Sequence, residues 1–591
     1  MSEGSGINIA MAGAGGDGVI AAGEILIRAL AAEGGYAMLS KSYGPQIRGG
    51  ESAFRLRYSS RPVLTAGARP DLLFVLDWED LFKFRELTPG ASTALVYDEL
   101  HPLDPWEEKL AGLGLKPDSP RLLAAPLDRR IREITGKGRG RNIMLLGMLA
   151  AWLGTFREAL LHSIESQFQA RGEELVKNNQ AAFQAGYEFA REHPCPVAFD
   201  AGTPEKGTPL SLADGNSMCA AGAVYAGCEF FAGYPITPAS EIMHFMSREL
   251  GLHDGVMLQA EDEIASIGAA LGASFAGKKA MTATSGPGLD LQTEMLGLAS
   301  IAELPLVLIN VQRGGPSTGL PTQTEQSDLF QAVFGGHGDI ARPVLAPWNA
   351  ANSFLTSIEA FNIAETLQTP VILLSDQQLA QRKETFVPPD LAGIRIHTRR
   401  SADDCSSGDG SSDSYRRYEL TPDGVSPFSV PGTSACAYQT GGLEHDEKSN
   451  LSTSGANHER MNRKRFEKLS PLQEREDLFD IEGPSDAPLG LIAWGSRAGA
   501  ALEAARLARE EGLPVKTLVP RLLYPVVEKV YRSFFSSLRA GFVIEQSYQG
   551  QLFRLLRMYL DLPPGLQSLK RSGGEPIAVN EILEKLREAE I

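Results

Sequence analysis

Three consecutive carboxylates, Glu261, Asp262 and Glu263, stand at the start of a stretch, 264–276, that has the pattern of a helix. Acidic side chains are common at helix starts because the helix dipole stabilises them there. The residues that follow are mostly small and apolar, however, which predicts a helix packed closely on a sheet. We therefore expect at least one carboxylate to point inward, where it must be neutral or accept hydrogen bonds. A carboxylate in that position is suited to sharing a proton with a ligand.

Two more segments with distinctive residues follow predicted strands. In the sequence GYPITP (233–238), two prolines flank Thr237, and Pro238 favours extended geometry at the threonine. This stiff turn would hold the Thr237 hydroxyl in a fixed direction, although capping of the next helix is the simpler explanation when the turn is considered alone. In the sequence Ser285-Gly286-Pro287-Gly288, two glycines allow a ligand to approach the backbone closely, and an ordinary tight turn is the alternative.

A fourth signal is Arg313, which follows a predicted strand and precedes the glycine-rich loop 314–319. A guanidinium group in that place suits bidentate binding of a carboxylate, and a surface arginine on a loop is the alternative. In a parallel α/β sheet the carboxyl ends of the strands meet at one edge, and ligands bind there. Since the four signals follow successive predicted strands, the sequence predicts one site at that edge.

These residues belong to the second of three predicted α/β units. Its strand-like runs alternate with helical stretches, which predicts a doubly wound parallel sheet. The runs are 229–234, 255–259, 279–284, 304–311 and 370–374. The predicted division of the whole chain is a first domain at 1–192, a linker at 193–209, a second domain at 210–395, a loop-rich connector at 396–485 and a third domain at 486–591. Within the connector, 401–414 is rich in Ser, Asp and Gly and is expected to be disordered or loop-like.

The composition excludes several classes of function. The net charge of −17 argues against sequence-independent binding to nucleic acid or to an anionic membrane, since both need a basic face. The five cysteines form no C-x-x-C pair, so neither a zinc nor an iron–sulfur site is expected from this chain alone. No secretory signal and no membrane-spanning segment is apparent, and the cytoplasm is the expected compartment.

At these residues the sequence resembles the alpha-type subunits of the 2-oxoacid:ferredoxin oxidoreductase family. The resemblance covers nearly the whole chain. Its motifs are GYPITPASE (233–241), QAEDEIASIGAALGAS (259–274), TATSGPGL (282–289), RGGPSTGLPTQTEQSDL (313–329) and LEHDE (443–447). The first domain resembles the family's gamma subunit through GAGGDGVIAAGEIL (13–26) and SYGPQIRGGES (42–52), and the third resembles the transketolase C-terminal domain. The implied fold is three doubly wound α/β domains, one of which binds the pyrimidine end of thiamine diphosphate.

The resemblance also implies residue roles. Glu263, five residues before Gly268, would hydrogen-bond the pyrimidine ring, with Glu261 as the alternative. Thr237 would contact the 2-oxoacid, and Arg313 would bind its carboxylate. The remaining cofactor-binding residues would be Tyr234, Pro235, Ser285, Gly286, Pro287 and Gly288.

The implied activity is the coenzyme A-dependent oxidative decarboxylation of a 2-oxoacid to acyl-CoA and carbon dioxide, with electrons passed to ferredoxin and with reversal possible. The fused gamma–alpha order favours 2-oxoglutarate. The sequence GDG occurs at 16–18 and 408–410, but neither copy has the paired asparagines that complete the diphosphate–magnesium motif. A beta-type partner subunit is therefore expected to hold the diphosphate, magnesium and an iron–sulfur cluster, with the active site at the subunit interface.

Two alternatives stay open. Indolepyruvate or another 2-oxoacid could be the substrate, and loops such as 415–450 are expected to influence that choice. The chain could also be a non-catalytic nucleotide-binding α/β protein, because Gly13, Gly15 and Gly18 have the spacing of a dinucleotide fingerprint. A convincing acidic residue about 20 positions later is absent from the sequence, which weakens the second alternative.

Overall fold

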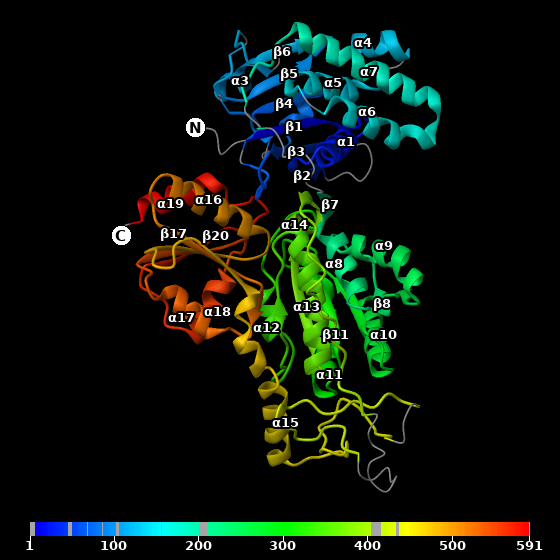
Figure 1. Cartoon of the computed structure of the whole chain (residues 1–591), viewed down its shortest axis with the longest axis vertical. Coiled ribbons are helices and arrows are strands. Elements are labelled where there is room, and N and C mark those ends of the chain that lie inside the picture. Colours follow the sequence, from blue (N-terminus) through cyan, green and yellow to red (C-terminus); the bar gives the residue numbers. More distant parts are fainter. Residues whose placement is uncertain are drawn as a thin grey trace. The chain divides into compact units, whose positions relative to one another are not determined.

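The chain forms two compact units in a computed structural model (Figure 1). The described residues are 6–44, 50–67, 69–84, 87–90, 92–101, 106–116, 118–136, 138–154, 156–199, 202, 210–402, 415–432 and 436–589. The first unit comprises Met1–Ala213 and Arg382–Pro388, and the second comprises Asp214–Gln381 and Pro389–Ile591. Parts of the predicted linker (200–201 and 203–209) and the segment 403–414 lie outside the described residues.

The first unit is built on an eight-stranded mixed sheet with the order β6-β5-β4-β1-β3-β2-β14-β7. Its strands are β1 (Ile7–Ala14), β2 (Tyr36–Tyr43), β3 (Glu51–Ser59), β4 (Leu72–Val75), β5 (Ala94–Asp98), β6 (Leu122–Ala125), β7 (Ser211–Asp214) and β14 (Lys383–Phe386). The predicted parallel pairing holds for β1, β4, β5 and β6, whereas β3 is antiparallel to β1 and β2. The connection between β2 and β3, residues 44–50, is too short for the crossover that a parallel pair needs.

Among the described residues, the helices of this unit are α1 (Val19–Ala32), α2 (Trp78–Leu81), α3 (Glu107–Gly112), α4 (Leu127–Thr135), α5 (Arg141–Leu153), α6 (Arg157–Phe168) and α7 (Glu173–Glu192). Strand β14 comes from the segment that was expected to belong wholly to the second domain. It joins the first sheet because Lys383 Nζ pairs with Glu24 at 2.6 Å and Ala37 N donates to Thr385 Oγ1 at 2.7 Å.

The second unit contains a seven-stranded sheet with the order β18-β12-β13-β11-β10-β8-β9. Its strands are β8 (Phe230–Gly233), β9 (Val256–Gln259), β10 (Ala280–Thr284), β11 (Leu306–Gln312), β12 (Val344–Leu345), β13 (Pro370–Asp376) and β18 (Leu522–Tyr524). All neighbours are parallel except β12 and β18. The five strand-like runs expected in this domain are therefore all strands, and the α/β class is confirmed.

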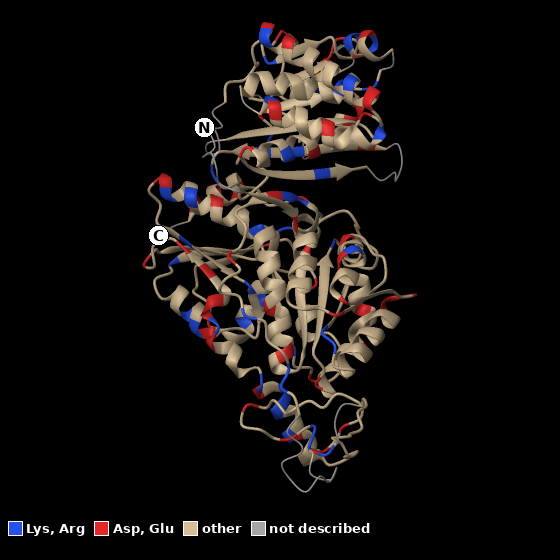
Figure 2. Ribbon diagram, turned by 45° about the vertical axis from the view of Figure 1, so that its right-hand side comes forward, with Lys and Arg blue, Asp and Glu red and all other residues tan. Residues whose placement is uncertain are grey.

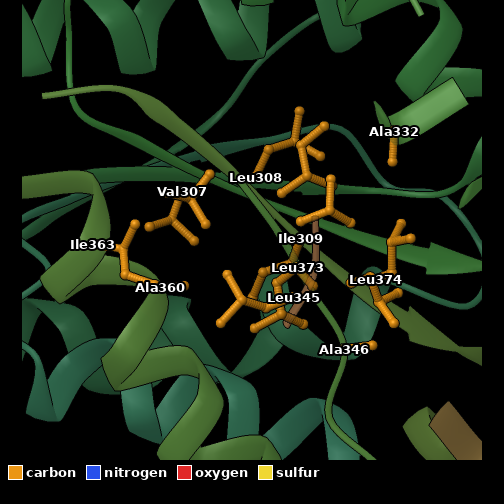
Figure 3. Close-up of a cluster of buried hydrophobic side chains, with 14 of the residues drawn as sticks. Val307, Leu308, Ile309, Ala332, Leu345, Ala346, Ala360, Ile363, Leu373 and Leu374 are labelled. Carbon is orange, nitrogen blue, oxygen red and sulfur yellow. The ribbon is translucent and has the colours of Figure 1, made fainter. Parts of the chain in front are cut away.

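The centre of this sheet is fully buried. Every residue of β11 and β13 is buried, as expected for parallel strands covered on both faces. Figure 3 shows Val307, Leu308 and Ile309 of β11 packed with Leu373 and Leu374 of β13. The helices of this domain are α8 (Gly215–Tyr225), α9 (Ser240–Glu249), α10 (Glu263–Phe275), α11 (Gly286–Ile301), α12 (Leu329–Phe334), α13 (Ala350–Leu367) and α14 (Gln377–Gln381).

A third sheet, in the same unit, has the order β15-β17-β16-β19-β20. Its strands are β15 (Phe479–Glu482), β16 (Leu489–Ala493), β17 (Val515–Pro520), β19 (Ala540–Glu545) and β20 (Leu566–Lys570). Its helices are α16 (Ala498–Glu510), α17 (Glu528–Phe535), α18 (Gln551–Tyr559) and α19 (Val579–Glu588). Strand β18 follows β17 directly and pairs with β12, so this C-terminal domain is joined to the seven-stranded sheet. In the parts of the chain that the structure describes, no helix is long and apolar enough to cross a membrane.

The predicted loop-rich connector contains an ordered segment, 415–432 and 436–468, which ends in α15 (Gly455–Glu467). Buried charges hold it in place. The Glu303 carboxylate accepts hydrogen bonds from Lys464 Nζ at 2.6 Å and from Lys468 Nζ at 3.1 Å, and all three side chains are almost completely buried. Buried Arg417 donates to the Glu303 carbonyl at 2.8 Å. Lys and Arg residues colour parts of α15 blue in Figure 2, toward the lower end of the picture.

This segment lies at the edge of the seven-stranded sheet that is opposite to the expected site. Glu303 precedes β11, whereas Arg313 follows it, so the segment lies at the amino edge of the sheet (Figure 1). A strand rises by about 3.3 Å per residue, which puts the two edges roughly 20 Å apart. The described residues of 415–450 therefore lie far from the carboxyl edge of this chain's sheet, and the expected influence of these loops on the choice of 2-oxoacid stays a prediction.

We expect Glu303→Gln to lower the free energy of unfolding by about 3–5 kcal/mol, because it leaves buried Lys464 and Lys468 without their carboxylate. Thermal denaturation measures the change. Glu459→Gln is the control, since the exposed Glu459–Arg463 pair on the same segment should contribute no more than about 0.5 kcal/mol. Equal denaturation midpoints for the two variants would show that the cluster does not stabilise the fold.

Candidate functional site

The turn that follows β8 is fixed through its backbone carbonyls. Asn216 Nδ2 donates to the Pro238 carbonyl at 2.7 Å, and Arg313 Nη1 donates to the Thr237 carbonyl at 2.6 Å. The side chains of Tyr234, Pro235 and Thr237 are exposed. Helix α9 begins at Ser240 with Ala239 in the capping position, so Thr237 does not have the capping role that was the simpler explanation. The turn holds the Thr237 hydroxyl free at the carboxyl edge of the sheet.

The three carboxylates after β9 have three different environments. Asp262 caps α10, since its side chain accepts a hydrogen bond from Ala265 N at 2.7 Å. Glu261 is exposed, whereas Glu263 is buried. A Cβ atom placed on Gly288 would lie 2.9 Å from Glu263 Oε1 and 1.9 Å from Thr284 Oγ1. Helix α11 can therefore approach the buried carboxylate only because residue 288 is glycine.

The turn after β10 is also tied to its neighbours. The Ser285 hydroxyl donates to the Val311 carbonyl at 2.8 Å, and α11 begins at Gly286 with Pro287 in its first turn. Gln292, which sequence reasoning missed, donates from Nε2 to the Glu263 carbonyl at 3.2 Å. Its buried Oε1 has no hydrogen-bond partner among the described residues. Gln292 lies one helical turn after Gly288, on the same face of α11, and this spacing is the signal in the sequence that could have identified it as a site residue.

Arg313 is a buried cation with spare hydrogen-bonding capacity. Only 7% of the residue is exposed, and its buried Nε has no partner in the described part of the chain. Burial lowers the pKa of Arg313, an effect that Asp328 opposes. A desolvated guanidinium group with an unused donor attracts an anion strongly. Arg313 is thus suited to a carboxylate ligand.

Asp328 is a second residue that sequence reasoning did not single out, although it lies in the motif 313–329. Asn310 Nδ2 donates to its carboxylate at 2.8 Å, and a Cβ on Gly286 would lie 3.2 Å from Asp328 Oδ2. Burial raises the pKa of Asp328 to about 6, despite the hydrogen bond from Asn310. The site therefore includes a carboxyl group that titrates near neutral pH.

The strand register brings these residues to one edge. Gly233 pairs with Gln259 and with Ala283, and Thr284 pairs with Asn310, so β9, β8, β10 and β11 end at similar heights. The segments that carry Glu263, Thr237, Ser285 and Arg313 leave these four neighbouring strands in that order. Thr237 and Arg313 are in direct contact, and so are Glu263 and the Gly288 turn.

The glycine-rich turn of the first unit does not offer an open anion site. Gly18, with φ 72°, precedes α1, and the Asp17 carboxylate accepts a hydrogen bond from Ala14 N at 3.0 Å. Arg141 Nη2 pairs with the same carboxylate at 2.6 Å. In a dinucleotide fold the amides of this turn face the pyrophosphate. Here a carboxylate of the chain takes that place, which argues against the nucleotide-binding alternative.

Comparisons with known proteins agree with the motifs. Residues 221–464 match the family described as "Pyruvate flavodoxin/ferredoxin oxidoreductase, thiamine diP-bdg", and residues 8–189 match "Pyruvate ferredoxin/flavodoxin oxidoreductase". The alpha subunit of 2-oxoacid:ferredoxin oxidoreductase 2 from Aeropyrum pernix is 31% identical, with 98% of each chain covered. The chain belongs to the 2-oxoacid:ferredoxin oxidoreductase family. The resemblance inferred from the sequence is thereby confirmed, and the protein is an oxidoreductase subunit.

Two other members of the 2-oxoacid:ferredoxin oxidoreductase family extend the comparison. The 2-oxoglutarate oxidoreductase subunit KorA of Mycobacterium tuberculosis is 34% identical over 88% of this chain and 82% of its own. A solved structure of 2-oxoglutarate:ferredoxin oxidoreductase from Magnetococcus marinus is 35% identical, with a TM-score of 0.91 over 99% of this chain and 100% of that chain. That structure is described with 2-oxoglutarate, coenzyme A and succinyl-CoA bound.

The site residues fit the pyrimidine end of thiamine diphosphate, the cofactor of this oxidoreductase family. The buried Glu263 carboxylate supplies a proton-sharing group, and glycine at 288 keeps the backbone beside it open. Gln292 Oε1, which has no partner among the described residues, is a further hydrogen-bond acceptor. Within the described ranges, no group of three or more His, Cys, Asp or Glu side chains is arranged to hold a metal ion.

Asp328→Asn tests the titration of the site through stability. The folded-state pKa of Asp328, about 6, lies above the ordinary 3.8. The contribution of this carboxyl group to the free energy of unfolding is therefore fully present below pH 3.8 and is lost as the pH rises through about 6. We expect the variant to be more stable than the wild type at pH 8, by up to about 3 kcal/mol, and to lose this advantage at pH 4. Thermal denaturation at both pH values measures it, with exposed Asp561→Asn as the control. A difference that does not change with pH would contradict the raised pKa.

Proposed function

We propose that this chain and a beta-type partner form a 2-oxoglutarate:ferredoxin oxidoreductase, which converts 2-oxoglutarate and coenzyme A to succinyl-CoA and carbon dioxide. The observation that carries the proposal is the contact between buried Arg313 and the Thr237 turn, on the same sheet edge as buried Glu263. The names of the relatives support the substrate, since the Mycobacterium protein is called a 2-oxoglutarate oxidoreductase subunit and the Magnetococcus structure is described with 2-oxoglutarate bound.

Thiamine diphosphate, when bound, supplies the carbon nucleophile and the electron sink for decarboxylation. The role proposed for Glu263 is to hydrogen-bond the pyrimidine ring and to exchange a proton with it. Burial between α10 and the Gly288 turn keeps water away from this carboxylate, which strengthens its interaction with a ring nitrogen. The other proposed pocket residues are Tyr234, Pro235, Ser285, Gly286, Pro287 and Gly288, with Glu261 left outside as an exposed residue.

Arg313 and Thr237 are proposed to bind the 2-oxoacid. The guanidinium group of Arg313, which is buried except for 7% of the residue, provides a charge-assisted donor for the carboxylate next to the keto group. The exposed hydroxyl of Thr237 provides a second donor, held at a fixed place by the Arg313 hydrogen bond to its own carbonyl. Together they orient the substrate so that the bond to the departing carboxylate faces the cofactor.

A partner subunit is proposed to cover the free edge of the seven-stranded sheet. Strand β9 is the edge strand, and Val256 and Leu258 on it are exposed together with Ile264 on α10 and Leu291 on α11. A Cβ placed on Gly268 or Gly272 of α10 would have no described atom within 4 Å, so another backbone can approach this helix. An apolar face beside an unpaired strand is typical of a protein interface. The beta-type subunit would bring the diphosphate site, magnesium and the iron–sulfur cluster to Glu263, with ferredoxin as the electron acceptor and the cytoplasm as the compartment.

Coexpression with a beta-type subunit tests the activity. We expect the complex to copurify and to reduce a dye with 2-oxoglutarate and coenzyme A faster than with pyruvate or indolepyruvate.

Arg313→Ala should raise the KM for the 2-oxoacid by about 100-fold or more, since a charge-assisted bidentate contact is lost. The affinity for thiamine diphosphate should stay close to that of the wild type. A preference for indolepyruvate would overturn the substrate, and loss of thiamine binding would overturn the role of Arg313.

Replacing Glu263 separates the two acidic candidates. We expect Glu263→Gln to lower kcat by about 100-fold to 10,000-fold, as removal of a group in general acid–base catalysis does. Glu261→Gln is the matched control, because the same change is made on an exposed side chain two residues earlier. Steady-state kinetics of the two complexes decide between them. If the Glu261 variant loses activity and the Glu263 variant keeps it, the assignment is reversed.

A further inference from the structure

The loop that carries Arg313 is a closed hairpin. This loop, residues 313–326 and here called the Arg313 loop, links β11 to α12. Gly314 N donates to the Gln323 carbonyl at 3.0 Å, and Leu320 N donates to the Gly314 carbonyl at 2.8 Å. The two limbs are thus tied together at their base, directly beside Arg313. Any shift of the returning limb, 324–326, is therefore passed to the backbone that holds the guanidinium group.

The C-terminal domain holds the returning limb through Gln326. This residue is completely buried, and its Nε2 donates to the Trp494 carbonyl at 2.7 Å. Its Oε1 accepts a hydrogen bond from Gln546 N at 2.9 Å, and its own N donates to the Gln546 carbonyl at 2.6 Å. Trp494 and Gln546 directly follow β16 and β19, which are neighbouring parallel strands. One amide side chain thus bridges the carboxyl ends of two strands of the other sheet.

Asp376 provides a second attachment. It is fully buried at the end of β13, where it pairs in register with Gln312, the residue before Arg313. Its Oδ1 accepts a hydrogen bond from Thr324 Oγ1 at 3.1 Å, and its Oδ2 accepts one from Ser496 N at 2.9 Å. One carboxylate therefore connects the returning limb, the seven-stranded sheet and the C-terminal domain.

The C-terminal domain is shaped for this contact. Gly495 has φ 56°, and a Cβ placed on it would lie 2.5 Å from Gln326 Nε2 and 2.9 Å from Asp376 Oδ2. A second glycine turn approaches the same limb, since Gly573 N donates to the buried Glu325 carboxylate at 2.7 Å. Both turns need glycine, because side chains there would enter space that the returning limb occupies or would require a strained backbone.

We infer that Gln326 is a positioning residue for substrate binding, through which the C-terminal domain fixes Arg313 against the Thr237 turn. The inference rests on the proposed role of Arg313. Its physical basis is that a buried guanidinium group with an unpaired Nε is held by one hydrogen bond to Thr237, so its position depends on the backbone behind it. The C-terminal domain thereby contributes to substrate affinity through the loop it holds.

Kinetics of the coexpressed complex test this inference. Gln326→Leu preserves approximate volume and removes both side-chain hydrogen bonds. We expect the KM for the 2-oxoacid to rise about tenfold, while the KM for coenzyme A and the affinity for thiamine diphosphate stay within about twofold. Thr324→Val removes only the hydroxyl that contacts Asp376, and we expect a smaller rise in the same KM. Thr324→Val serves as the test variant if Gln326→Leu does not fold.

Two controls separate positioning from general stability. Gln368→Leu removes an equally buried amide, which donates to the Ser426 carbonyl at 2.8 Å at the opposite edge of the sheet. It should lower the denaturation midpoint and leave the KM unchanged. In a double-mutant cycle, Gln326→Leu should add no further rise in KM to Arg313→Ala, because its effect acts through that arginine.

The outcomes are distinguishable. A folded Gln326→Leu complex with unchanged KM, or a double mutant whose effects simply add, overturns the positioning role while leaving the proposed function intact. An Arg313→Ala complex with normal KM overturns the proposed role of Arg313 and the inference with it. A rise in KM for every substrate, shared with Gln368→Leu, shows that Gln326 has only a structural role.

Discussion

A buried cation determines how the candidate site is built. Arg313 follows a fully buried strand, and only 7% of the residue is exposed, so each of its contacts carries more weight than at the surface. One contact, to the Thr237 carbonyl, joins the ends of two strands that are not neighbours, since β10 lies between β8 and β11. In the proposed function, the remaining capacity of the group serves the 2-oxoacid. The rigid turn, the hairpin loop and the C-terminal domain all act on the position of this one side chain.

Close approach of backbones is the second constraint. Gly288 allows α11 to reach the Glu263 carboxylate, and Gly495 allows the C-terminal domain to reach Gln326 and Asp376. A Cβ at either position would overlap polar atoms that the site needs, so these glycines are required by space rather than by flexibility alone. The same geometry explains why Glu263 can be buried at all. Asp262 satisfies the helix start, which leaves the neighbouring carboxylate free to turn inward.

The sequence was sufficient for features that depend on strand order, and insufficient for those that depend on packing. The positions of Thr237, Glu263 and Arg313 at one edge were predictable because each follows a recognisable strand, and parallel strands end at one edge. Asp328 and Gln292 were missed because their distance along the chain from the strand ends hides their proximity in space. The way in which the loop-rich connector is held was not predictable for a related reason. Its buried Lys464 and Lys468 pair with Glu303, which lies far away in the sequence.

The separation of the two sheet edges limits where substrate selectivity can arise. The described parts of the connector, 415–432 and 436–468, are fastened beside Glu303 and Gln368, at the amino ends of β11 and β13. A 2-oxoacid whose carboxylate meets Arg313 extends only a few ångströms from it, far less than the length of β11. The far end of the substrate must therefore be recognised by groups at the carboxyl edge. In the proposed function, the exposed tip of the Arg313 loop, 315–322, is the segment of this chain placed to reach it, and the proposed partner's surface would complete the enclosure. Variation among family members in the accepted 2-oxoacid should accordingly follow the loop tip and the partner, and not the segment 415–468.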